Sequence, residues 1–284
     1  MKITKTTVFI LLLLSILYFR TFIWLINSWL SDPYYSHGFL IPIICGFVAW
    51  RNIRETKKEK GREQKFKHET EPEPFKPGIY IFAFGLILYI IGFIKIFPFL
   101  SALSFLFTLS GLILYFYGKP LMRSFLFPIT FFIFAIPLPF VFLEKVAYVL
   151  QSLSAYYPTL IIEMLGIPVT RIGTEIQLED ASFIIGLPCS GMNSLISLLA
   201  LATFFIYILK CPLYKKAALL CATIPLAIFA NILRVTSLLL IATAYGAETA
   251  NGFFHTFFSP LLFIIAFIFL ILISIIIGCK VTVK

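Results

Sequence analysis

The chain has 284 residues, of which 60% are hydrophobic and 17% aromatic, while only 13% are charged. A soluble domain needs more polar surface than this composition supplies, so it excludes the soluble classes and predicts an all-α polytopic membrane protein. The net charge of +10 would suggest nucleic-acid binding in a soluble protein. Here its distribution has a simpler explanation, given below, and we expect no nucleic-acid partner.

Long apolar runs occupy most of the chain, and about 20 residues are enough to cross a hydrocarbon core of about 30 Å. Eight transmembrane helices are the most economical count, and we expect them to form one domain over residues 1–284. The first run lacks a small-residue cleavage site and is too long for a signal peptide, so it is expected to be retained. The predicted spans are Thr6–Leu30, Gly38–Trp50, Gly78–Ile96, Phe99–Tyr117, Phe125–Leu143, Gly191–Leu209, Ala217–Ala244 with a break near Arg234, and Phe257–Gly278.

The basic residues set the predicted orientation. With a cytoplasmic amino terminus, 18 of the 23 Lys and Arg residues fall on the cytoplasmic side. The positive-inside rule therefore predicts a multi-pass protein of the cell (inner) membrane with both termini in the cytoplasm. The charged segment 51–77 is then a solvated, partly helical cytoplasmic loop, with contact to lipid headgroups or a partner as the alternative.

An extracytoplasmic segment, residues 144–188, precedes the sixth span. Residues 146–166 place apolar side chains at helical spacing, which predicts an amphipathic helix along the outer membrane interface. Residues 167–186 alternate apolar and polar side chains around "GT" and "ED", which predicts a short hairpin. The hairpin leads directly to Cys189 at the outer mouth of the sixth span.

The predicted topology separates the five cysteines. Cys45 and Cys221 lie inside spans, where a free cysteine usually acts as a small hydrophobe. Cys211 and Cys279 lie at cytoplasmic ends. Cys189 alone lies outside, so it has no partner there for a disulfide. A lone thiol in an oxidising compartment favours a chemical role.

Three other polar residues are predicted near the same membrane level as Cys189. His37 and His255 fall at the outer face, where an interfacial structural role is the alternative. Arg234 lies about 17 residues, or ~25 Å, from the cytoplasmic start of its span. A guanidinium at membrane depth is costly without partners, although an interfacial arginine can snorkel. Asn231, three residues earlier, shares nearly the same helical face.

These residues suit acyl transfer through a thioester. A cation such as Arg234, or the amino terminus of the sixth span, favours the thiolate of Cys189. Backbone N–H groups at Ser190 and Gly191 are expected to face an incoming carbonyl. His255 is expected to protonate the leaving amine and then deprotonate the incoming nucleophile.

The sequence contains four specific motifs, followed by His255 before the last span: "DPYYSHGFLIP", "FPITFFIFAIPLP", "PCSGMNSL" and "NILRV". This succession resembles the exosortase/archaeosortase family of membrane transpeptidases over almost the whole chain. The resemblance implies that Cys189 is the nucleophile, that Arg234 supports the thiolate or the oxyanion, and that His255 is the acid and base. Ser190, Gly191, Asn231 and His37 are expected to support the site or bind substrate.

The resemblance also implies the partners. The substrates would be membrane-tethered secreted proteins with a carboxy-terminal sorting signal, made of a Pro-containing motif, a hydrophobic span and a basic tail. The product would pass to an envelope acceptor whose identity the sequence does not give. The remaining partner is the lipid bilayer.

Two alternative functions use the same residues. A cysteine protease of this architecture would only hydrolyse the tail. A transporter would line a path with Arg234 and His255, but the third to fifth spans offer little polar lining beyond Ser, Thr and Tyr. No metal or other cofactor is expected, because His37 and His255 lack a third histidine or a clear carboxylate at ligand spacing.

Overall fold

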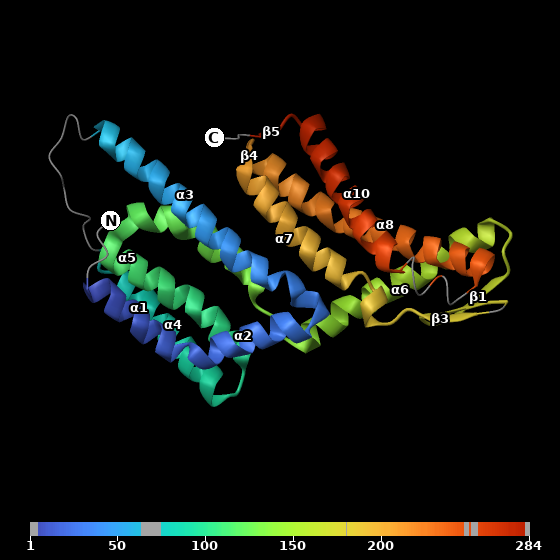
Figure 1. Ribbon diagram of the computed structural model, residues 1–284, viewed down its shortest axis with the longest axis horizontal. Helices are drawn as coiled ribbons and strands as arrows, with labels where there is room; N and C mark the ends of the chain where they lie inside the picture. The colour runs from blue at the N-terminus through green and yellow to red at the C-terminus, as the bar shows by residue number, and fades with distance from the viewer. Residues whose placement is uncertain (1–4, 64–74, 180, 247–249, 251–254, 282–284) are drawn as a thin grey trace. The chain divides into compact units, whose positions relative to one another are not determined.

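The computed structural model describes residues 5–63, 75–179, 181–246, 250 and 255–281. The chain divides into two compact units, residues 1–138 and 139–284. The first contains α1 (Lys5–Leu17), α2 (Phe19–Ser31), η1 (Pro33–Phe39), α3 (Leu40–Glu63), α4 (Gly78–Ile94), α5 (Pro98–Phe131) and η2 (Phe132–Ala135). The second contains α6 (Phe140–Met164), β1 (Val169–Ile172), β2 (Glu175–Leu178), β3 (Ser182–Ile184), η3 (Leu187–Cys189), α7 (Met192–Ile208), β4 (Leu209–Lys210), α8 (Leu213–Tyr245), α10 (His255–Ile276) and β5 (Lys280–Val281) (Figure 1).

Glycines on α4 let it pack closely against α5. Gly78, Gly85 and Gly92 recur every seven residues and are all buried. A Cβ at Gly85 would lie 2.5 Å from Thr108 Oγ1, and one at Gly92 would lie 2.7 Å from Ser101 Oγ. Small residues that allow backbones to approach are typical of helix pairs in membranes, where van der Waals packing drives association.

The predicted first span is bent rather than straight. Its two halves, α1 and α2, meet at Tyr18 with an angle of 65°. The fully buried Tyr18 hydroxyl contacts Ser104 Oγ at 3.0 Å and Thr108 Oγ1 at 2.7 Å on α5. These hydrogen bonds satisfy a phenol that is otherwise surrounded by apolar residues.

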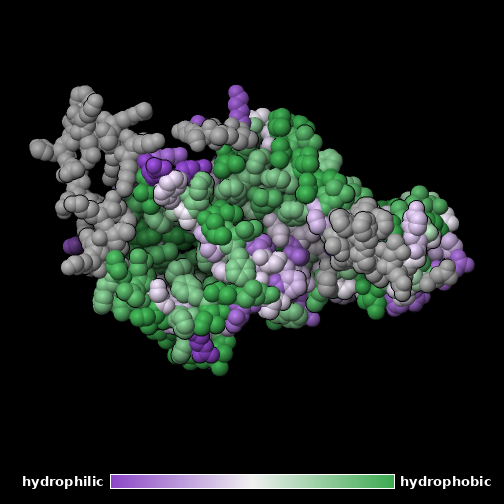
Figure 2. Space-filling model, in the orientation of Figure 1, coloured by the Kyte–Doolittle hydropathy of each residue, from purple (hydrophilic) through white to green (hydrophobic). Residues whose placement is uncertain are grey.

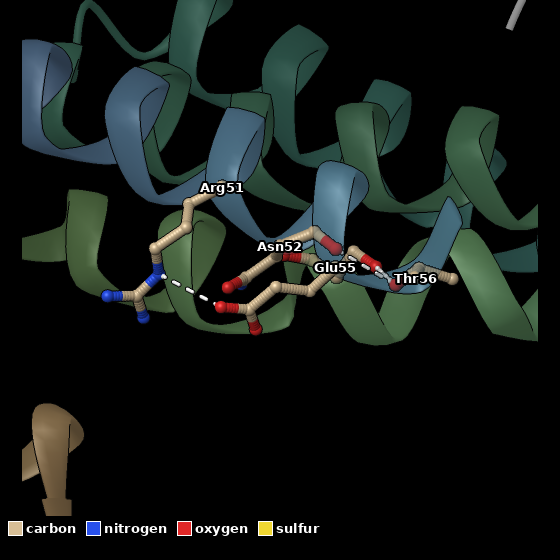
Figure 3. A network of polar contacts seen from close by, with 5 residues as sticks. Arg51, Asn52, Glu55 and Thr56 are labelled. Atoms are coloured by element: carbon tan, nitrogen blue, oxygen red, sulfur yellow. Dashed lines mark hydrogen bonds and ion pairs between the residues drawn. The ribbon is translucent and has the colours of Figure 1, made fainter. Parts of the chain in front are cut away.

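Helix α3 runs past the end of the predicted second span and into the charged segment 51–77. Asn52 Nδ2 donates to Ser124 O at 2.9 Å, and the hydroxyls of Thr56 and Ser124 lie 3.1 Å apart. Arg51 and Glu55 form a 3.9 Å ion pair one turn apart on α3 (Figure 3). The expectation of a partly helical loop is confirmed as far as Glu63, and residues 64–74 lie outside the described residues.

The count of eight spans is not confirmed. Among the described helices, Pro98–Ala135 and α8 are long and apolar enough to cross a membrane, and the bent pair α1 and α2 counts as a third. Helices α4 and α7 have 17 residues each, about 25 Å. They are therefore somewhat shorter than the hydrocarbon core.

Two predictions about individual spans are wrong. The fifth predicted span, Phe125–Leu143, is divided between α5, η2 and α6, and the backbone leaves the helix at Ile136. Pro137 and Pro139 lack the N–H groups that a helix interior needs, which explains the division. The break expected near Arg234 is also absent, because α8 is one continuous helix across that position.

In the second unit, α7, α8 and α10 lie side by side (Figure 1). Helix α6 and an antiparallel sheet in the order β1-β2-β3 are found where the sequence predicted an amphipathic helix and a hairpin. Strand β3 is an additional strand that the prediction did not include. One apolar core joins these parts; it contains Ala155 and Ile162 from α6, Ile176 and Phe183 from the sheet, and Val235 and Leu239 from α8.

The other end of this unit is joined covalently. A disulfide links Cys211, just before α8, to Cys279, just before β5, and β4 pairs with β5 beside it. Lys215 Nζ also donates to Ile277 O at 2.6 Å. The sequence placed both cysteines at the same membrane side but did not predict their pairing.

Hydrophobic side chains cover most of the face shown in Figure 2. Large apolar residues point outward on several helices, including Leu30 at 72%, Ile43 at 68% and Ile276 at 83% exposure. Such a surface is stable when lipid, rather than water, surrounds it. The chain is therefore a helical membrane protein.

Candidate active site

The predicted nucleophile lies on a tight turn, residues 186–191, between β3 and α7. Cys189 N donates to Gly186 O at 3.1 Å, and Ser190 N donates to Leu187 O at 3.2 Å. The Ser190 hydroxyl donates to Leu187 O at 2.7 Å and accepts from Met192 N at 3.2 Å. The Ser190 N–H is thus used within the turn, and a carbonyl bound beside Cys189 would compete with Leu187 for it.

Gly191 caps the start of α7 in a backbone conformation that side chains disfavour. Its φ is +81°, in the left-handed region, and it accepts a hydrogen bond from Leu195 N at 2.9 Å. This glycine connects the turn that carries Cys189 to the first residue of α7. The start of α7 at Met192 agrees with the predicted sixth span.

Two neighbouring helices hold the turn from outside. Asn231 on α8 donates through Nδ2 to Cys189 O at 3.1 Å and to Ser154 Oγ on α6 at 2.7 Å. Ser154 Oγ in turn donates to Ser190 O at 3.5 Å. Ser154, Ser190 and Asn231 are all buried. The prediction that Asn231 supports the site is consistent with these contacts, whereas Ser154 was not predicted.

Arg234 lies one turn beyond Asn231 on α8. Its side chain is partly buried, and it lies near enough to Cys189 for an electrostatic interaction. The structure thus brings together the thiol and the cation that the sequence predicted to act together.

A small cavity lies between α7, α8 and α10, beside Arg234. It leaves about 10 Å³ for the centre of a water molecule, which is roughly the room that one water needs. Within the described part of the chain, no donor reaches the buried Oδ1 of Asn231. A water molecule in the cavity would find hydrogen-bonding residues there, because Ser194, Asn231 and Arg234 all contribute to the lining.

The structure describes the side chain of His37 but not that of His255. His255 is the first residue of α10, and its side chain lies outside the described residues, so its role stays a prediction. His37 lies in η1 of the first unit, with its ring 6.1 Å from that of Tyr35. Burial lowers the pKa of His37, and a hydrogen bond to the backbone of Phe134 opposes this change. His37 is therefore expected to be neutral at pH 7.

Within the described residues, no group of three or more His, Cys, Asp or Glu side chains is placed to hold a metal ion.

The residue that sequence reasoning missed is Ser154. Its signal was available, since a serine that lies among Leu150, Ala155 and other buried residues of α6 must find a hydrogen-bond partner in the core. Only the fold reveals that its partners are the Asn231 amide and Ser190 O.

A family comparison covers both the turn and the α8 residues. The family model described as "Transmembrane exosortase (Exosortase_EpsH)" matches residues 29–272. The chain belongs to the transmembrane exosortase family. The matched range includes Cys189, Asn231, Arg234 and His255, so the predicted exosortase motifs all fall inside it. No curated protein and no solved structure matches the chain.

Proposed function

We propose that this exosortase is a protein-sorting transpeptidase of the cell membrane, with Cys189 as its nucleophile. The observation that carries the proposal is the position of Cys189 on a braced turn, within electrostatic reach of Arg234. Family membership over residues 29–272 adds independent support.

The proposed reaction has two acyl-transfer steps. The thiolate of Cys189 attacks the carbonyl carbon of the scissile peptide bond, and Arg234 stabilises the negative charge on sulfur or on the carbonyl oxygen. His255 donates a proton to the leaving amine, so the carboxy-terminal tail departs and a thioester remains. An envelope nucleophile, deprotonated by His255, then attacks the thioester, which releases the acylated product and restores the Cys189 thiolate with the proton back on His255.

Membrane confinement accounts for how enzyme and substrate meet. The proposed substrates are secreted proteins held in the bilayer by the hydrophobic span of a sorting signal, between a Pro-containing motif and a basic tail. An enzyme in the same bilayer meets the peptide bond next to that span at a high effective concentration. The charge distribution supports cytoplasmic termini and an extracytoplasmic active site.

The test is intact mass spectrometry of a co-expressed membrane protein that carries such a tail. Cells would contain the wild-type enzyme, Cys189→Ala, or Cys221→Ala as the matched control. Cys221 is also a free cysteine, but it is exposed on α8 away from the turn. We expect tail loss with a mass adduct on the new carboxyl end in the wild type and in Cys221→Ala only.

Each other result has a defined meaning. Tail loss without an adduct would replace transfer by hydrolysis. Normal processing by Cys189→Ala would reject the thiol as nucleophile. If the wild-type enzyme processes no tail from a panel with varied Pro-containing motifs, the sorting function is rejected and the transporter alternative is tested by uptake assays.

A further inference from the structure

Ser154 of α6 has no part in the reaction described above, yet its hydroxyl contacts the nucleophile turn. We propose that Ser154 is a positioning residue, which acts with Asn231 to fix the backbone of Cys189 and Ser190. The proposal rests on the proposed function of Cys189. Ser154 touches no reacting atom and acts through Asn231 and the turn.

The hydrogen bonds form a continuous bridge from α6 to α8. One Nδ2 hydrogen of Asn231 goes to Ser154 Oγ at 2.7 Å, and the other goes to Cys189 O at 3.1 Å. The Ser154 hydroxyl hydrogen goes to Ser190 O at 3.5 Å. Side chains from two helices thus contact the carbonyls of two consecutive residues: the bond from Asn231 to Cys189 O has an ordinary length, and the one from Ser154 to Ser190 O is long.

The direction of the Ser154 hydroxyl distinguishes it from other hydroxyls on the same helix. Ser and Thr within helices commonly bond the carbonyl four residues earlier. Ser152 does so with Tyr148 O at 3.0 Å, and Thr159 does so with Ala155 O at 2.8 Å. The bonds described for Ser154 instead leave its own helix for Asn231 and Ser190. A buried hydroxyl used in this way fixes tertiary rather than helical geometry.

The hydrogen bonds within the turn do not by themselves fix its position relative to α6 and α8. Its internal hydrogen bonds run from Cys189 N to Gly186 O and from Ser190 to Leu187 O. These bonds set the shape of the turn but do not fix its position over α6 and α8. Because the Cys189 sulfur is carried by this backbone, a shift of the turn displaces the thiol relative to Arg234. Misplacement by about 1 Å can cost on the order of 100-fold in rate.

The experiment compares Ser154→Ala, Ser154→Thr and the matched control Ser152→Ala in the full-length enzyme in proteoliposomes. Amide hydrogen exchange of a peptide covering residues 186–191 is the readout that needs no substrate. We expect exchange in this peptide to rise about tenfold in Ser154→Ala and to remain at the wild-type level in Ser152→Ala. Ser154→Thr keeps the hydroxyl and is expected to restore most of the protection.

The second readout is processing of the tailed membrane protein. For Ser154→Ala we expect kcat to fall about tenfold with an unchanged KM, because the thiol is misplaced while substrate binding persists. Unchanged exchange of the turn in Ser154→Ala would overturn the proposal. So would an activity loss that only follows the loss of folded protein, measured by thermal unfolding.

The control for the underlying function is Cys189→Ala. If that variant processes substrate normally, the proposed function fails, whatever Ser154 does. If Cys189→Ala is inactive while Ser154→Ala has wild-type kcat and exchange, the positioning role alone fails.

Discussion

Gly191 lies directly against the side chain of Asn231: a Cβ added to Gly191 would lie 2.6 Å from Asn231 Cγ. The residue that caps α7 and the residue that donates to Cys189 O therefore occupy adjoining space. No larger side chain at position 191 fits unless Asn231 moves, and such a movement would break the bridge to Ser154 and Cys189.

Gly191→Ala is accordingly expected to reduce both stability and activity. The left-handed backbone alone costs an alanine about 1–2 kcal/mol, and displacement of Asn231 adds to it. Gly173→Ala is the matched control, since Gly173 also has a positive φ, +65°, but nothing lies within 4 Å of its Cβ position. Thermal unfolding and tail processing would be measured for both. Equal losses in the two variants would show that contact with Asn231 contributes nothing.

Arg234→Gln is expected to slow alkylation of Cys189 by iodoacetamide at pH 7.5. Removal of the cation weakens the electrostatic support that we propose for the reacting sulfur, and a rise of about 1.4 kcal/mol in the activation barrier corresponds to about tenfold in rate. Arg234→Lys should retain part of the rate, because it keeps the charge. The rate is followed by mass spectrometry of the peptide that contains Cys189.

Arg20→Gln is the control for that measurement. Arg20 is another arginine in an apolar helix, and its guanidinium lies 5.5 Å from the centre of the Phe93 ring. It is expected to leave alkylation unchanged. Wild-type alkylation in Arg234→Gln would contradict the electrostatic role of Arg234.

His37 is expected to make the fold sensitive to acid. Burial lowers its pKa in the folded protein below the ordinary value of 6.5. Below about pH 6.5 the unfolded chain therefore binds a proton that the folded chain resists, so stability falls as the pH falls. The difference in melting temperature between wild type and His37→Gln should shrink from pH 8 to pH 5.5. A constant difference over this range would refute the prediction.

In the oxidised protein, the disulfide between Cys211 and Cys279 is expected to stabilise the end of the second unit where β4 pairs with β5. It closes a loop with a sequence separation of 68 residues, and a disulfide of this kind contributes about 2–4 kcal/mol. Cys211→Ser should lower the unfolding temperature of the solubilised protein by as much as dithiothreitol does. Cys221→Ser, which removes a free cysteine, should not change it.

The redox state of Cys211 and Cys279 in cells tests the proposed membrane orientation. Disulfides persist in oxidising compartments and are rare in the cytoplasm, whereas the basic residues around this end predict that it faces the cytoplasm. Under the proposed orientation, Cys211 and Cys279 should be alkylated without reductant when cells are lysed in the presence of iodoacetamide. A fully oxidised pair in those cells would place this end outside and would reverse the proposed topology.

The sequence by itself determined the membrane class, the helical composition, the sheet segment before the sixth span, and the family. These properties follow from local patterns: long apolar runs, alternation around "GT" and "ED", and the wording around Cys189 and Arg234. Hydropathy did not predict that the fifth span is divided. Its apolar run continues across Pro137 and Pro139, and a hydropathy value does not reflect the missing backbone N–H group of proline.

Only the tertiary structure decided which residues meet. Ser154, Cys189 and Asn231 come from three segments, and neither the spacing of α6 nor that of α8 specifies that their polar side chains meet at one turn. Cys211 and Cys279 are likewise 68 residues apart and pair only because α7, α8 and α10 bring their ends together. Local patterns fix secondary structure and membrane preference, whereas contacts between distant segments depend on how helices pack, and packing is a property of the whole fold.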